Sequence, residues 1–197
     1  MLVGAWILAA ASAVARSGRV GAAEAAAFRV FNRLPGRLEG TMHGVQFLGT
    51  LGVAPLLATA ALLRGRRRLA LAVTSATAIK LVSERLVRRF LARRGRPGTT
   101  ISGAVVRGGE NSKGLGFVSG HVALVSALGW NLASYMPDGC KHAPWDVAGL
   151  VALSRIYLGA HSPVDVVGGA GLGLVAGGLA NLMVGVDPRA RDRRHGR

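Results

Sequence analysis

The chain has 197 residues, of which 50% are hydrophobic and 17% charged, and its formal net charge is +16. Soluble domains carry about 25% charged residues. Here the hydrophobic residues form long blocks, and the basic residues lie mainly between them, where they serve as topology signals and contact lipid headgroups. This pattern is typical of an integral membrane protein and argues against a nucleic-acid partner. The length fits one domain over residues 1–197, and the single cysteine, Cys140, excludes an intrachain disulfide.

The first half of the chain predicts two membrane spans and a surface helix. Residues 1–15 are apolar but shorter than the ~20 residues that cross a bilayer. They end in a sequence that resembles a signal-peptidase site, so a retained span is favoured but a cleaved signal stays open. Residues 22–34 predict an amphipathic helix on the membrane surface. The second span is expected at 42–63, kinked at Pro55, and the arginines of 64–68 favour the cytoplasmic side.

The third span begins near Leu69 and is interrupted by charges. Lys80 and Glu84 are four residues apart, so they either pair on one helix face or belong to an active site. The loop 92–118 is rich in glycine but has no nucleotide-binding fingerprint, because no strand pattern precedes it.

Three further spans are predicted at 120–136, 144–158 and 163–186, followed by a basic tail at 187–197. Six spans place the tail and the 64–68 loop on one side, which the positive-inside rule makes cytoplasmic. The 92–118 loop and the turn after residue 158 then lie outside the cytoplasm. The basic segment 16–40 would also lie outside, and it contradicts the rule.

His161 and Asp165 flank the start of the last predicted span. Ser162 fits a helix N-cap and Pro163 the first helical position. A carboxylate that bonds one imidazole nitrogen fixes the tautomer and leaves the other nitrogen free to attack. The alternative is that Ser162 only caps the helix and Asp165 only meets its dipole.

Ser119, Gly120 and His121 begin the fourth span. A helix N-terminus offers free N–H groups and a favourable dipole to an anion. Ser119 can donate its hydroxyl group, Gly120 lets the backbone approach closely, and His121 can protonate a leaving group. The alternative is that Ser119 is only a cap and His121 an interfacial residue.

Arginines complete the pattern. Guanidinium groups match phosphate oxygens in bidentate fashion, and fixed cations stabilise the transition state of phosphate ester hydrolysis. Arg89 and Arg96 are seven residues apart, on one face of a continued helix, and Arg155 comes from the fifth span. Arg93 and Arg94 are interpreted instead as a solvated patch that faces lipid headgroups.

These three pieces together resemble the type 2 phosphatidic acid phosphatase superfamily. Its ordered signatures are Lys-x6-Arg-Pro, Pro-Ser-Gly-His and Ser-Arg-x5-His-x3-Asp. The third is complete from Ser154 to Asp165, the second has Val118 in place of proline, and the first has Arg89 in place of lysine. The resemblance covers about residues 80 to 165 directly. The resemblance implies an all-α bundle of about six transmembrane helices, with a helical core like that of the haloperoxidases.

The resemblance also implies a role for each matching residue. His161 attacks phosphorus and becomes a phosphohistidine, Asp165 orients it, and His121 protonates the leaving group. The residues that would hold the phosphate are Arg89, Arg96, Ser119, Gly120 and Arg155. No metal or other cofactor is expected.

The sequence therefore predicts a metal-independent membrane lipid phosphatase with its site on the extracytoplasmic side of the plasma membrane. The substrates left open are a polyprenyl diphosphate or polyprenyl-phosphate sugar, phosphatidic acid and phosphatidylglycerol phosphate; the oligomeric state is not predicted. One alternative is a non-enzymatic protein that binds anionic lipid. Another is a vanadate-dependent haloperoxidase, against which the membrane spans argue because those relatives are mainly soluble.

Overall fold

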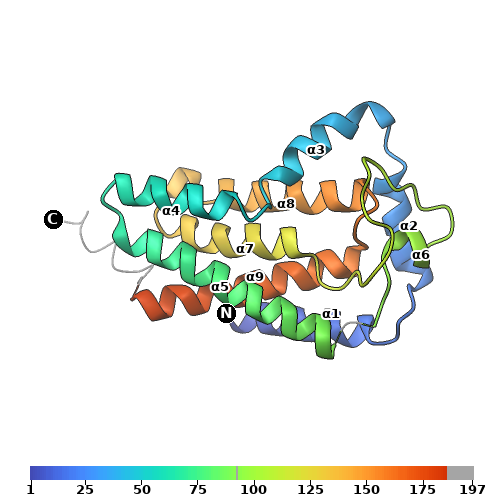
Figure 1. Ribbon diagram of the computed structural model, residues 1–197, viewed down its shortest axis with the longest axis horizontal. Helices are drawn as coiled ribbons and strands as arrows, with labels where there is room; N and C mark the ends of the chain where they lie inside the picture. Colours follow the sequence, from blue (N-terminus) through green and yellow to red (C-terminus); the bar gives the residue numbers. More distant parts are fainter. Residues whose placement is uncertain (92, 186–197) are drawn as a thin grey trace.

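The computed structural model describes residues 1–91 and 93–185, and its long helices run side by side (Figure 1). The basic tail at 187–197 lies outside the described residues. The helices are α1 (Leu2–Ala15), α2 (Ala22–Asn32), α3 (Glu39–Phe47), α4 (Val53–Leu63), α5 (Arg67–Phe90), α6 (Pro97–Thr100), α7 (Gly120–Ala133), α8 (Ala143–Tyr157) and α9 (Pro163–Val184). The predicted all-α bundle is confirmed, because each predicted span contains helix.

Helix α9 packs against α1, α5 and α7 and forms the centre of the bundle. It faces α7 with Gly169, Gly173 and Gly177, one residue per turn. A Cβ atom on Gly173 would lie 2.3 Å from the Ala123 carbonyl oxygen, and one on Gly177 2.7 Å from that of Ala127. Glycine at this spacing lets two helix backbones approach closely, as in packed membrane helices.

By length and composition, α9 is the one described helix that meets the requirement for a membrane span, and α1 and α4 are shorter apolar helices. Helix α1 packs along α9: a Cβ atom on Gly4 would lie 2.6 Å from Leu174 Cβ. Helix α2 forms where the surface helix was predicted. It packs against α8 and α9 at one end of the bundle, with Phe28 fully buried (Figure 1).

The predicted span at 42–63 is wrong as a continuous helix, because the chain breaks between α3 and α4. The Thr50 hydroxyl donates to the Phe47 carbonyl oxygen over 2.8 Å, and the Gly49 N–H donates to the Gln46 carbonyl oxygen over 2.9 Å. These bonds replace the regular backbone hydrogen bonds of an α-helix. The predicted kink at Pro55 is also wrong. Pro55 lies in the first turn of α4, where its missing N–H has no helical partner to lose.

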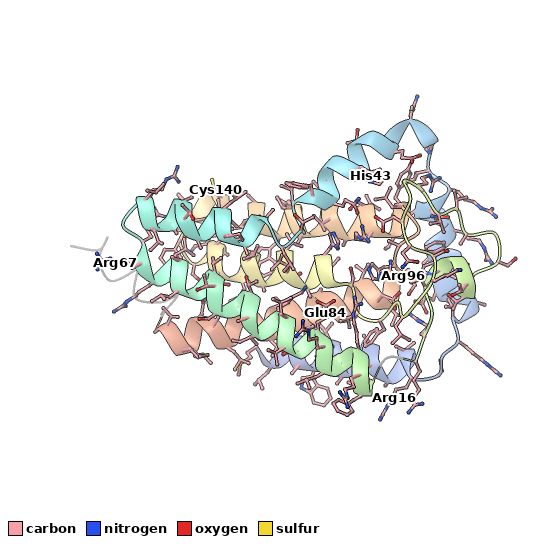
Figure 2. All side chains as sticks on the ribbon, viewed as in Figure 1. Arg16, His43, Arg67, Glu84, Arg96 and Cys140 are labelled. Atoms are coloured by element: carbon pink, nitrogen blue, oxygen red, sulfur yellow. The ribbon has the colours of Figure 1, made fainter. Side chains whose placement is uncertain are left out.

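The break brings the chain against the start of α7. A Cβ atom on Gly49 would lie 2.9 Å from the Cβ of His121. The loop after α5, the start of α7 and the end of α8 meet at the end of the bundle that α2 covers (Figure 1). Figure 2 shows Arg96 there, with Arg67 and Cys140 toward the opposite end. The fold thus collects the three sequence motifs at one end.

Candidate active site

A cavity of about 620 Å³ lies between α5, the start of α7 and the end of α8. Five of the eight predicted site residues line it: Arg96, Gly120, His121, Arg155 and His161. They come from the loop after α5, from the first turn of α7, from the last turn of α8 and from the α8–α9 turn. The remaining lining residues are Gly49, Thr50, Leu51, Lys80, Leu81, Glu84, Arg85, Arg88, Glu110 and Asn111.

His161 is 2% exposed and held in one tautomer. Its Nδ1 lies 2.9 Å from the Gly116 carbonyl oxygen. A carbonyl oxygen can only accept, so Nδ1 carries the proton and Nε2 of the neutral ring keeps a free lone pair. Burial, followed by the positive charges of Arg155 and Arg96, lowers the pKa of His161 well below its usual value of 6.5. The neutral, nucleophilic form of the imidazole is therefore favoured.

Asp165 does not bond the imidazole, and this expectation is wrong. Its Oδ2 lies 4.0 Å from His161 Nδ1, beyond hydrogen-bond range. The same oxygen accepts the Ser162 N–H over 2.9 Å, in a capping box at the start of α9. Asp165 therefore fixes the turn that carries His161, and the Gly116 carbonyl oxygen accepts the imidazole N–H that was expected to bond the carboxylate.

Arg94 is fully buried, so its interpretation as a solvated, headgroup-facing residue is wrong. Its two terminal nitrogens donate to Glu24 over 2.8 and 2.9 Å. Nη2 also donates to Ser162 Oγ over 2.7 Å and to Asp165 Oδ1 over 3.2 Å. Burial alone would lower the pKa of Arg94, but Glu24 and Asp165 outweigh it and raise the pKa. The residue ties α2 and the loop to the turn behind His161.

Arg88, and not Arg89, is found among the described residues that line the cavity. Arg89 is exposed, and its guanidinium carbon lies 5.7 Å from the Phe90 ring centroid. Successive helical residues point about 100° apart, so Arg88 and Arg89 point in different directions. Arg89, which was expected in the phosphate site, therefore lies away from the cavity, and Arg88 lines it.

The predicted pairing of Lys80 with Glu84 is confirmed. Lys80 Nζ lies 2.6 Å from Glu84 Oε2, and Arg88 Nη2 lies 2.8 Å from Glu84 Oε1. The pair also lines the cavity (Figure 2 labels Glu84), and a role in the active site stays a prediction.

Positive charge accumulates around His161. Burial and the nearby charges of Arg155 and Arg88 lower the pKa of Arg96. Four arginines line the cavity: Arg85, Arg88, Arg96 and Arg155. Guanidinium groups that share one cavity repel one another, and an anion between them relieves that repulsion. This arrangement fits a bound phosphate group.

Ser119 occupies the N-cap position of α7 and is fully buried. Its hydroxyl oxygen has no hydrogen-bond partner among the described residues, and Ser119 is not one of the described cavity-lining residues. Gly120 is packed against α5: a Cβ atom there would lie 2.6 Å from Glu84 Oε1. The first turn of α7 thus presents Gly120 and His121 to the cavity, with free N–H groups at a helix N-terminus.

Within the described ranges 1–91 and 93–185, no group of three or more His, Cys, Asp or Glu residues is placed to hold a metal ion. A family model described as the PAP2 superfamily matches residues 68–188, more than half of the chain. The chain belongs to the PAP2 superfamily. The matched region contains α5, apart from its first residue, and all three sequence motifs.

Two solved PAP2-like folds resemble this member of the superfamily. LpxE from Aquifex aeolicus has a TM-score of 0.70 at 22% identity, over 78% of this chain and 91% of that one. The first transmembrane PAP2 type phosphatidylglycerolphosphate phosphatase, from Bacillus subtilis, has a TM-score of 0.71 at 21% identity, over 92% of this chain and 94% of that one. At these identities the likeness establishes the fold. No curated protein matches the chain.

Two functional candidates of this PAP2 chain were missed by sequence reasoning, Arg88 and Glu110. For Arg88 a signal existed, because it follows Lys80 and Glu84 at the four-residue spacing of one helix face. Glu110 lies in a loop without periodicity, and no local pattern indicated that it meets Arg155 across 45 residues of sequence.

Proposed function

We propose that the protein is a membrane lipid phosphatase that works through a phosphohistidine. The observation that carries this proposal is the state of His161. Its Nδ1 is committed to the Gly116 carbonyl oxygen, and Nε2 is the free nitrogen of a residue that lines a cavity with four arginines. A neutral imidazole beside fixed cations is suited to attack a phosphorus atom whose oxygens those cations hold.

The reaction has two balanced steps. Nε2 of His161 attacks phosphorus, and the bond between phosphorus and the lipid oxygen breaks. The leaving oxygen takes the electron pair and receives a proton from His121, so the lipid leaves as an alcohol, or as a lipid phosphate from a diphosphate. A water molecule, activated by His121, then attacks phosphorus; the bond from phosphorus to Nε2 breaks, and inorganic phosphate is released.

Several residues would stabilise the developing charge. Arg96 and Arg155 line the cavity together with Arg88, which takes the place expected for Arg89. The Gly120 amide would donate from the start of α7. The Ser119 hydroxyl, which has no hydrogen-bond partner among the described residues, would donate as well. Asp165 would act through the turn that it caps.

A lipid substrate and a membrane location agree with the apolar blocks of the chain and with the fold shared with a transmembrane phosphatase. We propose that residues 1–197 act as one domain and that the site opens at the extracytoplasmic face of the plasma membrane. Candidate substrates are a polyprenyl diphosphate or polyprenyl-phosphate sugar, phosphatidic acid and phosphatidylglycerol phosphate.

Phosphate release by the detergent-purified protein tests the proposal, with wild type beside His161→Asn on a panel of these lipids. We expect the variant to lose at least about 10³-fold in rate, because its amide cannot form the intermediate. Wild-type activity should persist in EDTA and fall with orthovanadate, which mimics five-coordinate phosphorus. Equal release by both proteins would reject the phosphohistidine. Lipid binding by folded wild type, without release from any substrate, would indicate an anionic-lipid-binding protein.

A further inference from the structure

The guanidinium group of Arg155 is already occupied by a carboxylate. Nη1 donates to Glu110 Oε1 over 2.8 Å, and Nη2 donates to Oε2 over 3.0 Å. The side chains are 4% and 15% exposed, so the pair is largely removed from water. A phosphate group binds an arginine through the same two parallel bonds. Glu110 and a substrate phosphate therefore compete for one pair of donors.

Glu110 enters this competition as an anion. Burial alone would raise its pKa, but the hydrogen bonds and the positive charge of Arg155 outweigh burial and lower the pKa. The carboxylate is thus ionised throughout the physiological pH range. The exchange at Arg155 replaces one anion by another, so Arg155 need not be left as an unpaired buried charge at any stage.

Glu110 is carried by a short segment, 108–114, that is anchored at both ends. On one side, the Arg107 N–H donates to the Leu158 carbonyl oxygen over 3.0 Å. On the other side, the Gly116 N–H donates to the Arg94 carbonyl oxygen over 2.9 Å. The segment between these bonds is called the flap below. Within it, the Glu110 N–H donates to the Arg107 carbonyl oxygen over 3.1 Å. Both anchoring bonds lie outside the flap, so its movement does not require either of them to break.

The flap has glycine at its two limits. Gly108, Gly109 and Gly114 have φ values of 59°, 70° and 91°, in the region that side chains rarely adopt. Glycine can leave such a conformation at little steric cost, and hinge positions absorb large changes of φ and ψ. The backbone on both sides of Glu110 is therefore suited to a change of conformation.

Arg155 has a second partner that need not leave. Nη1 also donates to Gln46 Oε1, and Gln46 Nε2 donates to His43 Nδ1 over 2.8 Å. Gln46 belongs to α3, outside the flap, and its amide group is neutral. It can keep Arg155 directed into the cavity after Glu110 has moved away.

We propose that Glu110 holds Arg155 while the phosphate site is empty, and that a bound phosphate group displaces Glu110 and releases the flap. The inference rests on the proposed function, because it takes Arg155 as a phosphate ligand. When hydrolysis is complete, the return of Glu110 to Arg155 expels inorganic phosphate. The contact weakens substrate binding and speeds product release.

Inhibition by orthovanadate tests the competition, with wild type beside Glu110→Gln. Glutamine keeps the shape but not the charge. If the flap is released in about one tenth of empty molecules, the variant should bind vanadate about tenfold more tightly, since apparent affinity scales with the competent fraction. Its KM for phosphate esters should fall, and product inhibition by inorganic phosphate should become stronger.

Asp146→Asn is the matched control. Asp146 is an exposed residue in the first turn of α8, and the substitution removes the same charge away from the cavity. We expect wild-type inhibition from it. Weaker or unchanged vanadate binding in Glu110→Gln would overturn the competition and assign Glu110 to the positioning of Arg155. Failure of wild type to bind vanadate or to release phosphate would overturn the proposed function as well.

Hydrogen exchange supplies a readout that a positioning role would not give. In wild type, vanadate should speed amide exchange in residues 108–114, whereas ligands ordinarily slow exchange around their site. In Glu110→Gln, exchange there should be fast without vanadate. Slower exchange in wild type on vanadate binding would contradict release of the flap, whatever the affinities are.

Discussion

Two buried arginines in this molecule make nearly the same contact and are suited to different tasks. Arg94 bonds Glu24 through both terminal nitrogens, and Arg155 bonds Glu110 in the same way. Arg94 is fully buried, with hydroxyl and carboxylate partners behind the His161 turn. Arg155 lines the cavity. An arginine–glutamate pair can therefore serve either as a structural contact or at a binding site. What distinguishes the two pairs is whether a competing anion can reach the arginine.

The largest expected effect is on stability at Arg94. Arg94→Met should destabilise the protein by about 3–5 kcal/mol, because Glu24 and Asp165 remain as buried carboxylates without a positive counter-charge. Thermal unfolding in detergent measures this, and activity should be lost together with the fold. A variant that unfolds at the wild-type temperature would remove the distinction between the two arginines.

The next effect is on activity at Arg155. Arg155→Lys keeps the charge but loses the two-point geometry, so kcat/KM should fall by about 10²-fold. Its melting temperature should stay close to that of wild type, because a lysine can still pair with Glu110. A large loss of stability with normal turnover in the remaining folded protein would contradict the binding role.

Arg88 and Arg89 allow the comparison to be made between neighbours on one helix. Arg88→Ala should lower kcat/KM by about tenfold or more, since it removes a cation from the cavity. Arg89→Ala should change it less than about twofold, as expected for an exposed residue. Phosphate release from one lipid substrate measures both, and the opposite order would restore Arg89 as the phosphate ligand.

The smallest expected effect is a shift in pH dependence. The lowered pKa of His161 places the acid limb of kcat/KM below pH 6.5. Arg155→Gln removes a neighbouring positive charge, so the pKa of His161 and the acid limb should move up. Ionisation of the substrate is common to both proteins and cancels in the comparison. A limb that does not move would exclude His161 as the titrating group.

The same shift affects stability, and its sign is fixed by linkage. Between the lowered pKa of folded His161 and the usual 6.5, the unfolded chain binds more protons than the folded chain. The contribution of His161 to the free energy of unfolding is therefore fully present above about pH 6.5. It declines as the pH falls from 6.5 toward the lowered pKa of the folded state.

The sequence could predict the bundle and five of the residues that line the cavity, because apolar blocks and ordered motifs are local signals. His161, His121 and Arg155 were located from ordered motifs that resemble the superfamily signatures. The break at Leu48–Gly52 was missed because glycine and threonine are tolerated inside long apolar blocks. Whether Arg88 or Arg89 faces the cavity depends on the direction in which each side chain points from the helix. An error of one residue in the assigned position is enough to exchange the two.

Long-range pairing explains the other errors. The partner of Arg94 is Glu24, which is 70 residues away, and a run of arginines reads locally as a solvated patch. The bond from His161 to Gly116 is equally invisible, because any residue can supply a carbonyl group. Motif spacing identifies which side chains react, whereas backbone acceptors and buried counter-charges depend on the path of the loops.

The single cysteine has a practical consequence. Cys140 is exposed and lies in the α7–α8 connection, toward the end of the bundle opposite Arg96 (Figure 2). A membrane-impermeant maleimide can therefore report orientation on the unmodified chain. If the cavity opens outside the cell, Cys140 should be labelled in inverted vesicles and protected in intact cells. A tether at this thiol would also fix the molecule to a surface with its cavity facing the solution.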